Sequence, residues 1–191
     1  MGKSTTANMF EKLGYPVFDA DKQVHKLYRK GGQAVRQIAQ IFPDVITNGA
    51  VNRQLLAAKI SKDKTVLPRI EKIVHPMVRS LEKKFVSDQQ KANAKLIILD
   101  IPLLFETGRT KDVDIIIVVS ATEKQQRQRV LQRPGMTQEK LDVILARQIP
   151  DKEKQRQADY VINTGKSLED TFGQVKKLVV KLTSPTNKLE A

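Results

Sequence analysis

Three residues at the start of the chain have the types and the order of a phosphate-binding loop. Gly2, Lys3 and Ser4 match the end of the pattern G-x-x-x-x-G-K-[ST]. In that pattern backbone N–H groups and the lysine contact the phosphates of a nucleotide, and the hydroxyl binds Mg²⁺. A helix is predicted to begin here, and its N-terminal amides and dipole favour an anion. We therefore expect Gly2, Lys3, Ser4 and Thr5 to hold nucleotide phosphates and Ser4 to hold the metal, with a capped surface helix as the alternative.

Three aspartates follow predicted strands and could do acid–base or metal chemistry. Asp19 and Asp21 end "YPVFDAD", and Asp100 ends "LIILD", and ligands of open α/β sheets bind beyond the carboxyl ends of strands. Side chains two residues apart on a strand share a face, so Asp19 and Asp21 would repel each other unless a cation or a hydroxyl donor lay between them. This favours a base or metal-side role, with helix N-capping by one or both as the alternative. Asp100 has the place of the carboxylate that holds Mg²⁺ in nucleotide-binding sites of this kind.

His25 and His75 are the only histidines, and the chain has no cysteine. A zinc site is therefore not expected, because no set of these ligands has metal spacing. His75 precedes Pro76 within a helical pattern, where a proline bends the helix and can aim a polar side chain inward. From the residues alone, both histidines are interpreted as structural.

Arginines recur in "QQRQRVLQRPG" and on the helix predicted after it. Arg129 and Arg133 are four residues apart and are expected to share a helix face, and Arg147 lies on the following helix. If they face a nucleotide, these guanidinium groups would neutralise the phosphates in transfer. If they face solvent, they form an ordinary charged surface.

The elements that must position these residues are predicted from hydrophobic periodicity. The longest apolar run, "VDIIIVVS" at 113–120, is expected to be a strand buried on both faces. Elsewhere apolar residues recur three or four positions apart, as in helices. Buried strands alternating with helices predict an α/β fold with a parallel sheet covered by helices on both faces. Strands are expected in 15–21, 96–100, 113–120 and 159–164, and helices at 4–13, within 22–94, and at 122–133, 137–148 and 167–182.

Capping residues mark three of these helix starts. Thr122 with Gln125, and Ser167 with Asp170, have the spacing of capping boxes, and Thr137 is the expected N-cap of the helix between them. The last helix is expected to bury one apolar stripe, formed by Leu168, Phe172, Val175, Val179 and Leu182.

Composition limits the class of protein. The 191 residues are 40% hydrophobic and 29% charged, which is typical of one globular domain. The net charge of +13 indicates a polyanionic ligand, but the basic residues are scattered and tryptophan is absent, so a nucleic acid is not the expected partner. No apolar run is long enough for a membrane span or a signal peptide, and we expect a cytoplasmic protein without membrane contact.

Taken together, these stretches resemble the dephospho-coenzyme A kinase family. The half phosphate loop, "DAD" with His25, "VHP", "IPLLFE", "QRVLQRPGMT" and "ADYVINTG" occur in this order over essentially the whole chain. The resemblance implies the fold of a P-loop nucleoside-monophosphate kinase, as one domain over 1–191 with a helical substrate-binding insertion at 22–94 and a lid at 122–150. It also implies an ATP- and Mg²⁺-dependent enzyme that phosphorylates the ribose 3′-hydroxyl of dephospho-coenzyme A in the last step of coenzyme A synthesis. We expect a monomer, with a weak oligomer as the alternative.

The resemblance also implies roles for individual residues. Asp21 would take the proton of the 3′-hydroxyl, with Lys3 and lid arginines stabilising the transferred phosphate, while Arg129 contacts the nucleotide. Asp100 is not required by the family pattern, and many members carry arginine at the position of Ile144. The catalytic lid arginine is therefore Arg133 or Arg147. The residues expected to line the substrate side are Asp19, His25, His75, Pro102, Leu103 and Glu106.

The phosphate loop begins in the middle of its pattern, because only Met1 stands before Gly2. In the implied fold a buried strand and a glycine-rich turn precede it. We expect that Met1 is not the true start and that the first strand is missing from this chain. Its loss would remove roughly ten ladder hydrogen bonds at ~0.5–1.5 kcal/mol each, so the chain as printed is expected to be poorly stable and inactive.

Three other readings stay open at this point. One is another small-molecule kinase of the same fold, which acceptance of nucleosides would reveal. The second is a basic nucleic-acid-binding protein, which steeply salt-dependent binding would reveal. The third is a catalytically impaired chain that keeps the fold without a working nucleotide site.

Overall fold

The computed structural model describes residues 2–146 and 148–184 and divides the chain into two compact units. Unit 1 is built from the residues up to Val17 and from Asp100 onward, and unit 2 is Phe18–Leu99. Within these described ranges, no helix combines the length and the apolarity that crossing a membrane would need.

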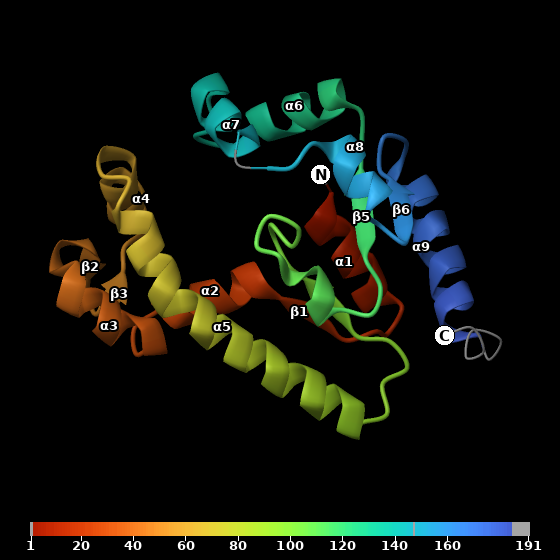
Figure 1. Ribbon diagram of the computed structural model, residues 1–191, viewed down its shortest axis with the longest axis horizontal. Helices are drawn as coiled ribbons and strands as arrows, with labels where there is room; N and C mark the ends of the chain where they lie inside the picture. Colours follow the sequence, from red (N-terminus) through yellow and green to blue (C-terminus); the bar gives the residue numbers. More distant parts are fainter. Residues whose placement is uncertain (1, 147, 185–191) are drawn as a thin grey trace. The chain divides into compact units, whose positions relative to one another are not determined.

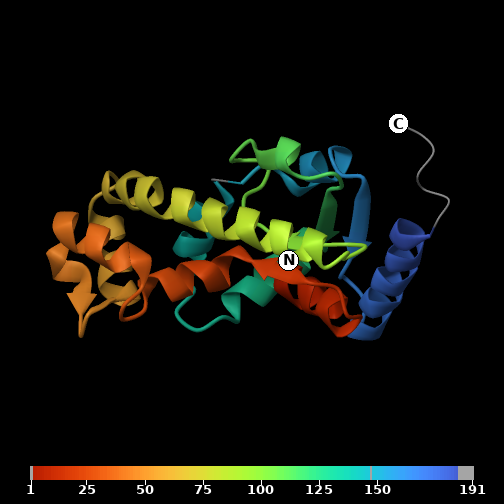
Figure 2. The same cartoon turned by 90° about the horizontal axis from the view of Figure 1, so that it is seen from below.

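Four helices make up most of unit 2, as the periodicity within 22–94 predicted. They are α2 (Ala20–Tyr28), α3 (Gln33–Ile41), α4 (Arg53–Lys62) and α5 (Val66–Lys91). The long helix α5 packs against each of the other three, and Figure 1 and Figure 2 show it running lengthwise through the unit. Its buried residues recur four apart, at Val66, Ile70, Val74 and Val78. This spacing places them on one face, which closes the core of the unit.

A short hairpin in unit 2 was not predicted. It follows the 3₁₀ turn Pro43–Val45 and pairs β2 (Ile46–Thr47) with β3 (Ala50–Val51) in antiparallel register. The turn residues Asn48 and Gly49 have φ 52° and 75°, and Asn-Gly is the pair that two-residue hairpin turns favour. The turn signal was therefore present, but strands of two residues are too short to show a period.

The remaining strands form two further pairs. β1 (Val17–Asp19) lies beside β4 (Ile98–Asp100), and β5 (Ile117–Ser120) is parallel to β6 (Tyr160–Asn163). The predicted α/β class is confirmed. The expectation that 113–120 is a strand buried on both faces is wrong, because β5 is shorter and Ile117 and Val119 are only half-buried. Among the described residues β5 has a single neighbouring strand, which leaves its other side less covered.

Among the residues of unit 1 that the structure describes, five α-helices and the 3₁₀ turn Arg109–Asp112 complete the unit. The helix α1 packs against α9, α8 against β5, and α9 against β6. The capping boxes at Thr122 and Ser167 and the N-cap at Thr137 are confirmed. The five helices are α1 (Lys3–Lys12), α6 (Glu123–Leu131), α7 (Gln138–Leu145), α8 (Asp151–Arg156) and α9 (Leu168–Thr183).

The predicted apolar stripe of α9 needs one correction. Val175 and Val179 are buried, but Leu168 is 69% exposed. Thr171 and Leu178 are buried instead. Leu168 is the first residue of the helix and lies at the rim of a pocket, where no packed element covers it.

Candidate functional site

The helix α1 begins after Gly2, and any other residue at this position would be strained. Gly2 has φ 107°, and a Cβ added to it would lie 3.2 Å from Thr164 Cγ2. The glycine is therefore required both by its left-handed backbone and by the close approach of Thr164. Gly2 is the N-cap of α1, and no side chain caps the helix there. Its first amides are thus available to an anion, which the helix dipole also favours.

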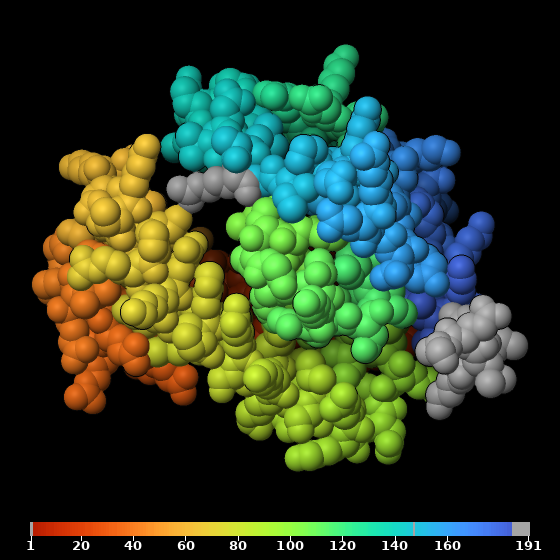
Figure 3. Space-filling model, in the orientation of Figure 1, coloured from red at the N-terminus to blue at the C-terminus, as the bar shows by residue number. Residues whose placement is uncertain are grey.

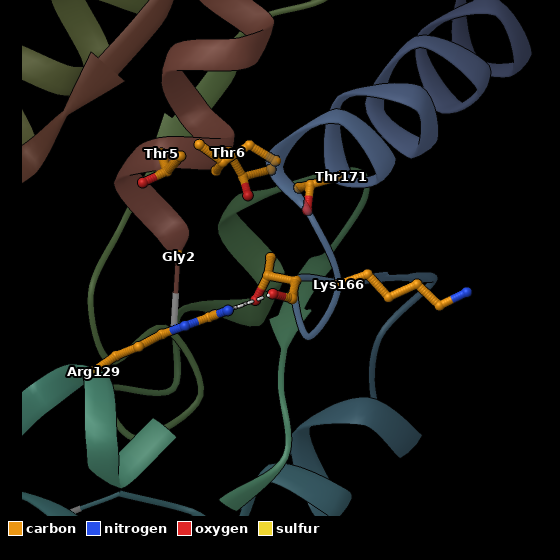
Figure 4. A pocket seen from close by; sticks show the side chains of 8 residues that line it. Gly2, Thr5, Thr6, Arg129, Lys166 and Thr171 are labelled. Carbon is orange, nitrogen blue, oxygen red and sulfur yellow. Dashed lines mark hydrogen bonds between the residues drawn. The ribbon is translucent and has the colours of Figure 1, made fainter. Parts of the chain in front are cut away.

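A pocket of about 230 Å³ lies beside this helix start. Its lining comes from α1, α6, the segment after β6 and the first turns of α9, and it includes no acidic residue. Figure 4 shows Arg129 crossing the pocket below Gly2, whereas the ammonium group of Lys166 points away from it. The pocket therefore combines hydroxyl groups with a positive charge. It is lined by Gly2, Thr5, Thr6, Arg129, Thr164, Lys166, Leu168 and Thr171.

Arg129 is held in place by the residue that follows β6. Its guanidinium donates to the Thr164 carbonyl at 2.8 Å and to Thr164 Oγ1 at 3.3 Å, as the dashed lines in Figure 4 indicate. Thr164 in turn donates to the Ser120 carbonyl through its amide, at 2.8 Å, and through Oγ1, at 3.0 Å. Arg129 is thus fixed to the carboxyl ends of both β5 and β6.

Lys3 forms an ion pair with Asp100, the last residue of β4. Asp100 is 4% exposed, and its Oδ2 is buried without a hydrogen-bond donor among the described residues. An unsatisfied buried carboxylate oxygen is costly, and it is the type of ligand that a hard cation prefers. Lys3 and Asp100 are 97 residues apart, so only the fold brings this pair together.

Ser4 and Thr5 lie exposed in the first turn of α1. Within the described part of the chain, no group of three acidic or histidine side chains could hold a metal ion by itself. Mg²⁺ in nucleotide sites takes one or two protein oxygens and completes its shell with phosphates and water. The hydroxyl of Ser4 and the free oxygen of Asp100 fit that requirement in chemical type.

In unit 2 the structure separates Asp19 from Asp21. Asp19 ends β1 and is the N-cap of α2, where its side chain accepts a hydrogen bond from the Lys22 amide at 2.9 Å. Asp21 lies in the first turn of α2. The expectation that both carboxylates share one face of a strand is therefore wrong, and the capping alternative holds for Asp19. The strand ends at Asp19, two residues before the expected end at Asp21, because capping satisfies an otherwise unpaired amide of α2.

Both histidines are exposed on helices of unit 2. His25 stands four residues after Asp21 on α2, so the two side chains lie on the same side of that helix. His75 is on α5, directly before Pro76, which lies inside the helix. The side chain of His75 is exposed, so Pro76 does not aim it inward.

The segment after β4 contains three of the expected substrate-side residues. Pro102 is half-buried, and Leu103 is exposed with φ 56°. Glu106 is largely buried, and its Oε1 accepts hydrogen bonds from the Ile149 amide at 2.9 Å and from Lys154 Nζ at 2.7 Å. Burial tends to raise the pKa of Glu106, but these two hydrogen bonds outweigh it and hold the pKa below its ordinary value.

The arginines are not arranged as one helical face. The helix α6 ends at Leu131 and Gln132 is its C-cap, so Arg133 lies in the turn beyond the helix. Its amide donates to the Val130 carbonyl at 3.0 Å. The expectation that Arg129 and Arg133 share a helix face is wrong, because the helix closes before "RPG". Arg147 lies outside the described residues.

Sequence reasoning found Thr5 but missed the other three threonines that line the pocket. Thr164 and Thr171 are buried, and the Oγ1 of Thr6 is buried without a partner among the described residues. The stretch "ADYVINTG" entered the analysis only as part of a resemblance. Its Thr164 is the residue that carries Arg129, and the signal was a polar residue directly after a strand, at the sheet edge where ligands bind.

Comparisons with known proteins agree on one family. A family model described as dephospho-CoA kinase matches residues 1–170. The dephospho-CoA kinase of Rhodopseudomonas palustris (strain HaA2) is 46% identical over 179 residues, which cover 94% of this chain and 89% of that protein. The dephospho-CoA kinase of Mesorhizobium japonicum is 46% identical over 182 residues, covering 95% of this chain and 91% of that protein.

Solved structures agree with this in fold. TT1252 from Thermus thermophilus is 31% identical and superposes with a TM-score of 0.77 over 95% of this chain and 92% of that chain. The dephospho-CoA kinase from Campylobacter jejuni is 24% identical and superposes with a TM-score of 0.72 over the same shares, 95% and 92%. At 24% identity, the similarity to the Campylobacter jejuni enzyme shows the fold alone.

Proposed function

This chain belongs to the dephospho-CoA kinase family, and we propose on that premise that it transfers the γ-phosphate of ATP to the ribose 3′-hydroxyl of dephospho-coenzyme A. The 3′-oxygen forms a bond to the γ-phosphorus, and the bond from that phosphorus to the β,γ-bridging oxygen breaks. The products are coenzyme A and ADP. The protein acts as a monomer in the cytoplasm.

The single observation that carries the nucleotide part of this proposal is the pocket at the start of α1. It joins an uncapped helix N-terminus to a fixed guanidinium, that of Arg129. Amides and arginine together favour a phosphorylated ligand. Gly2, Thr5 and Arg129 would contact ATP.

Lys3, Ser4 and Asp100 would hold the reacting phosphates and their metal. Lys3 would contact the transferred phosphate, and Ser4 Oγ and Asp100 Oδ2 would be ligands of Mg²⁺. Mg²⁺, when bound, neutralises charge that develops on the phosphate oxygens. Arg133 and Arg147 would add positive charge when 122–150 acts as a lid.

Asp21 would accept the proton of the 3′-hydroxyl. It is exposed on α2 and is not used as the cap of that helix, so its carboxylate is available to a substrate. The role of the region 22–94 would be to bind dephospho-coenzyme A through Asp19, His25 and His75, with Pro102 and Leu103 contributing from the segment after β4.

Release of ADP, measured with a coupled assay, tests the function. We expect release that depends on both ATP and dephospho-coenzyme A, and phosphorus NMR should place the new phosphate on the 3′-oxygen. Equal release with a nucleoside in place of dephospho-coenzyme A would point to another kinase of this fold. The same assay on this chain, and on a version extended by the residues encoded upstream, tests the expectation that the chain as printed is inactive.

A further inference from the structure

The loop after β4 is held in one conformation by its own hydrogen bonds. Thr107 donates to the Leu103 carbonyl twice, through its amide at 3.0 Å and through Oγ1 at 2.8 Å. Leu103 has φ 56°, in the left-handed region, which a leucine occupies only where the surrounding structure holds it. The backbone that carries the side chain of Glu106 is therefore restricted to one conformation.

Glu106 joins this loop to two segments far along the chain. Its Oε1 accepts from the amide of Ile149, which is 43 residues away in the connection from α7 to α8. The same oxygen accepts from Lys154 Nζ in α8, and the two side chains are only 12% and 18% exposed. Glu106 Oε2 is buried and has no donor among the described residues. The hydrogen bonding of this carboxylate is thus directed to the segment around Ile149 and to α8.

A second polar contact fixes α8 to the sheet. Asp151 Oδ2 accepts from Ser120 Oγ at 2.6 Å and from Gln155 Nε2 at 2.5 Å. Ser120 is the last residue of β5. The chain is therefore held at two neighbouring points, at Ile149 by Glu106 and at Asp151 by Ser120, just after it leaves α7.

Residues 122–146, here called the α6–α7 arm, lie between two such attachments. At its start, Gln125 Nε2 donates to the Gly165 carbonyl at 2.7 Å, and Arg129 is bound to Thr164. The arm lies on the surface of unit 1 (Figure 3), and near its end Val143 and Ile144 in α7 are 59% and 38% exposed. The arm carries Arg129 and Arg133, so the position of its ends affects where those guanidinium groups lie.

We propose that Glu106 is a positioning residue for the phosphoryl-transfer site, which fixes the segment at Ile149 through which the α6–α7 arm joins α8, and that it does not contact dephospho-coenzyme A. The effect on turnover rests on the proposed function, whereas the link between Glu106 and Ile149 does not. If the segment at Ile149 is no longer held by Glu106, the arginines of the α6–α7 arm occupy more positions. Turnover then falls without a matching change in ground-state binding of the acceptor, because transition-state contacts depend most on exact placement.

The first experiment follows hydrogen exchange of the Ile149 amide and needs no ligand. Glu106→Leu removes the acceptor, and we expect exchange of this amide to accelerate on the order of tenfold, as loss of one hydrogen bond implies. Glu106→Gln keeps an acceptor and should have a smaller effect. Glu169→Gln, an exposed glutamate of α9, is the matched control and should have none. Protection of Val118 in β5 reports whether unit 1 stays folded. An unchanged Ile149 rate in a folded Glu106→Leu variant would overturn the link.

The second experiment separates positioning from substrate contact. In the version extended by the upstream residues, we expect Glu106→Leu and Lys154→Met each to lower kcat roughly tenfold, with KM for dephospho-coenzyme A unchanged, and Glu106→Gln, which keeps an acceptor, to lower it less. The double variant Glu106→Leu with Lys154→Met should be no slower than Glu106→Leu alone, because both changes remove the contact between Glu106 and α8. A raised KM for dephospho-coenzyme A in Glu106→Leu but not in Lys154→Met would assign Glu106 to the substrate and overturn the proposal. Absence of kinase activity from the version extended by the upstream residues would overturn the proposed function, and the exchange rates would still decide the link.

Discussion

Lys3 is paired with Asp100 in this structure and is proposed to contact phosphate in the complex, so its replacement has two separable effects. Lys3→Met should lower kcat on the order of 10²–10³-fold, because a preorganised cation is lost from the site. It should also lower the free energy of unfolding, because Asp100 is left as a buried carboxylate without its partner. Steady-state kinetics and urea denaturation measure the two effects.

The combined variant Lys3→Met with Asp100→Asn distinguishes these effects. The neutral amide of asparagine does not require a cation, so stability should recover while activity stays low. If activity recovered along with stability, Lys3 would be a structural residue and its role toward phosphate would be wrong.

Asp21 and Asp19 are expected to respond differently to the same change. Asp21→Asn should lower kcat by roughly 10²-fold, within the range of general-base contributions, and leave the affinity for ATP unchanged. Asp19→Asn is the comparison: asparagine caps a helix about as well as aspartate and Asp19 caps α2, so kcat should be kept and only the KM for dephospho-coenzyme A should change. A damaging Asp19→Asn together with a silent Asp21→Asn would reverse the assignment of the base.

Glu106 should make the free energy of unfolding depend on pH in the acidic range. Burial tends to raise its pKa, but hydrogen bonds from Lys154 and Ile149 outweigh this and keep the pKa below the ordinary 4.5. The folded protein then binds this proton less readily than the unfolded chain, so the contribution is present above that value and is lost as the pH falls through the folded pKa. Urea denaturation should find the parent more stable than Glu106→Gln at neutral pH, with the difference shrinking in acid. A difference that stayed constant across this range would show that the charge of Glu106 is not involved.

At the scale of the element, α1 has a glycine in the left-handed region at each end. Gly14 has φ 86° and open space around it, whereas Gly2 has φ 107° and Thr164 close by. Alanine at either position should cost ~1–2 kcal/mol of stability through backbone strain. Only Gly2→Ala also displaces Thr164, which holds Arg129, so only this variant should weaken ATP binding. Isothermal titration with ATP makes the comparison, and equal losses of affinity in both variants would argue against the pocket as the nucleotide site.

Several elements could be predicted because their signals are local. The capping boxes at Thr122 and Ser167 lie within one helical turn, and both are present in the structure. The ends of α2 and α6 were less predictable. Asp19 can end a strand or cap a helix, and a charged residue such as Arg133 is compatible with a helix or with the turn after it. Neighbouring residues do not settle such choices, because the packed partner of the element decides where it ends.

At the scale of the whole molecule, the net charge of +13 should favour the binding of ATP. Salt screens such attraction, since the Debye length falls from ~10 Å at 0.1 M to ~3 Å at 1 M. The dissociation constant for ATP, measured by titration, should therefore rise with salt concentration. Adenosine, which carries no phosphate, is the control and should bind with little change. The same salt dependence for both ligands would mean that charge does not drive the binding of ATP.

The sequence by itself determined the α/β class and the family, because these depend on local periodicity and on the order of short motifs, and it predicted phosphate binding by Gly2 to Thr5. Only the tertiary structure decided which residues meet. Lys3 with Asp100, Arg129 with Thr164, and Glu106 with Ile149 are pairs whose members lie 97, 35 and 43 residues apart. Local preferences do not encode such contacts, which form only when strands pair and helices pack, and it is these contacts that fix the charges of the candidate site.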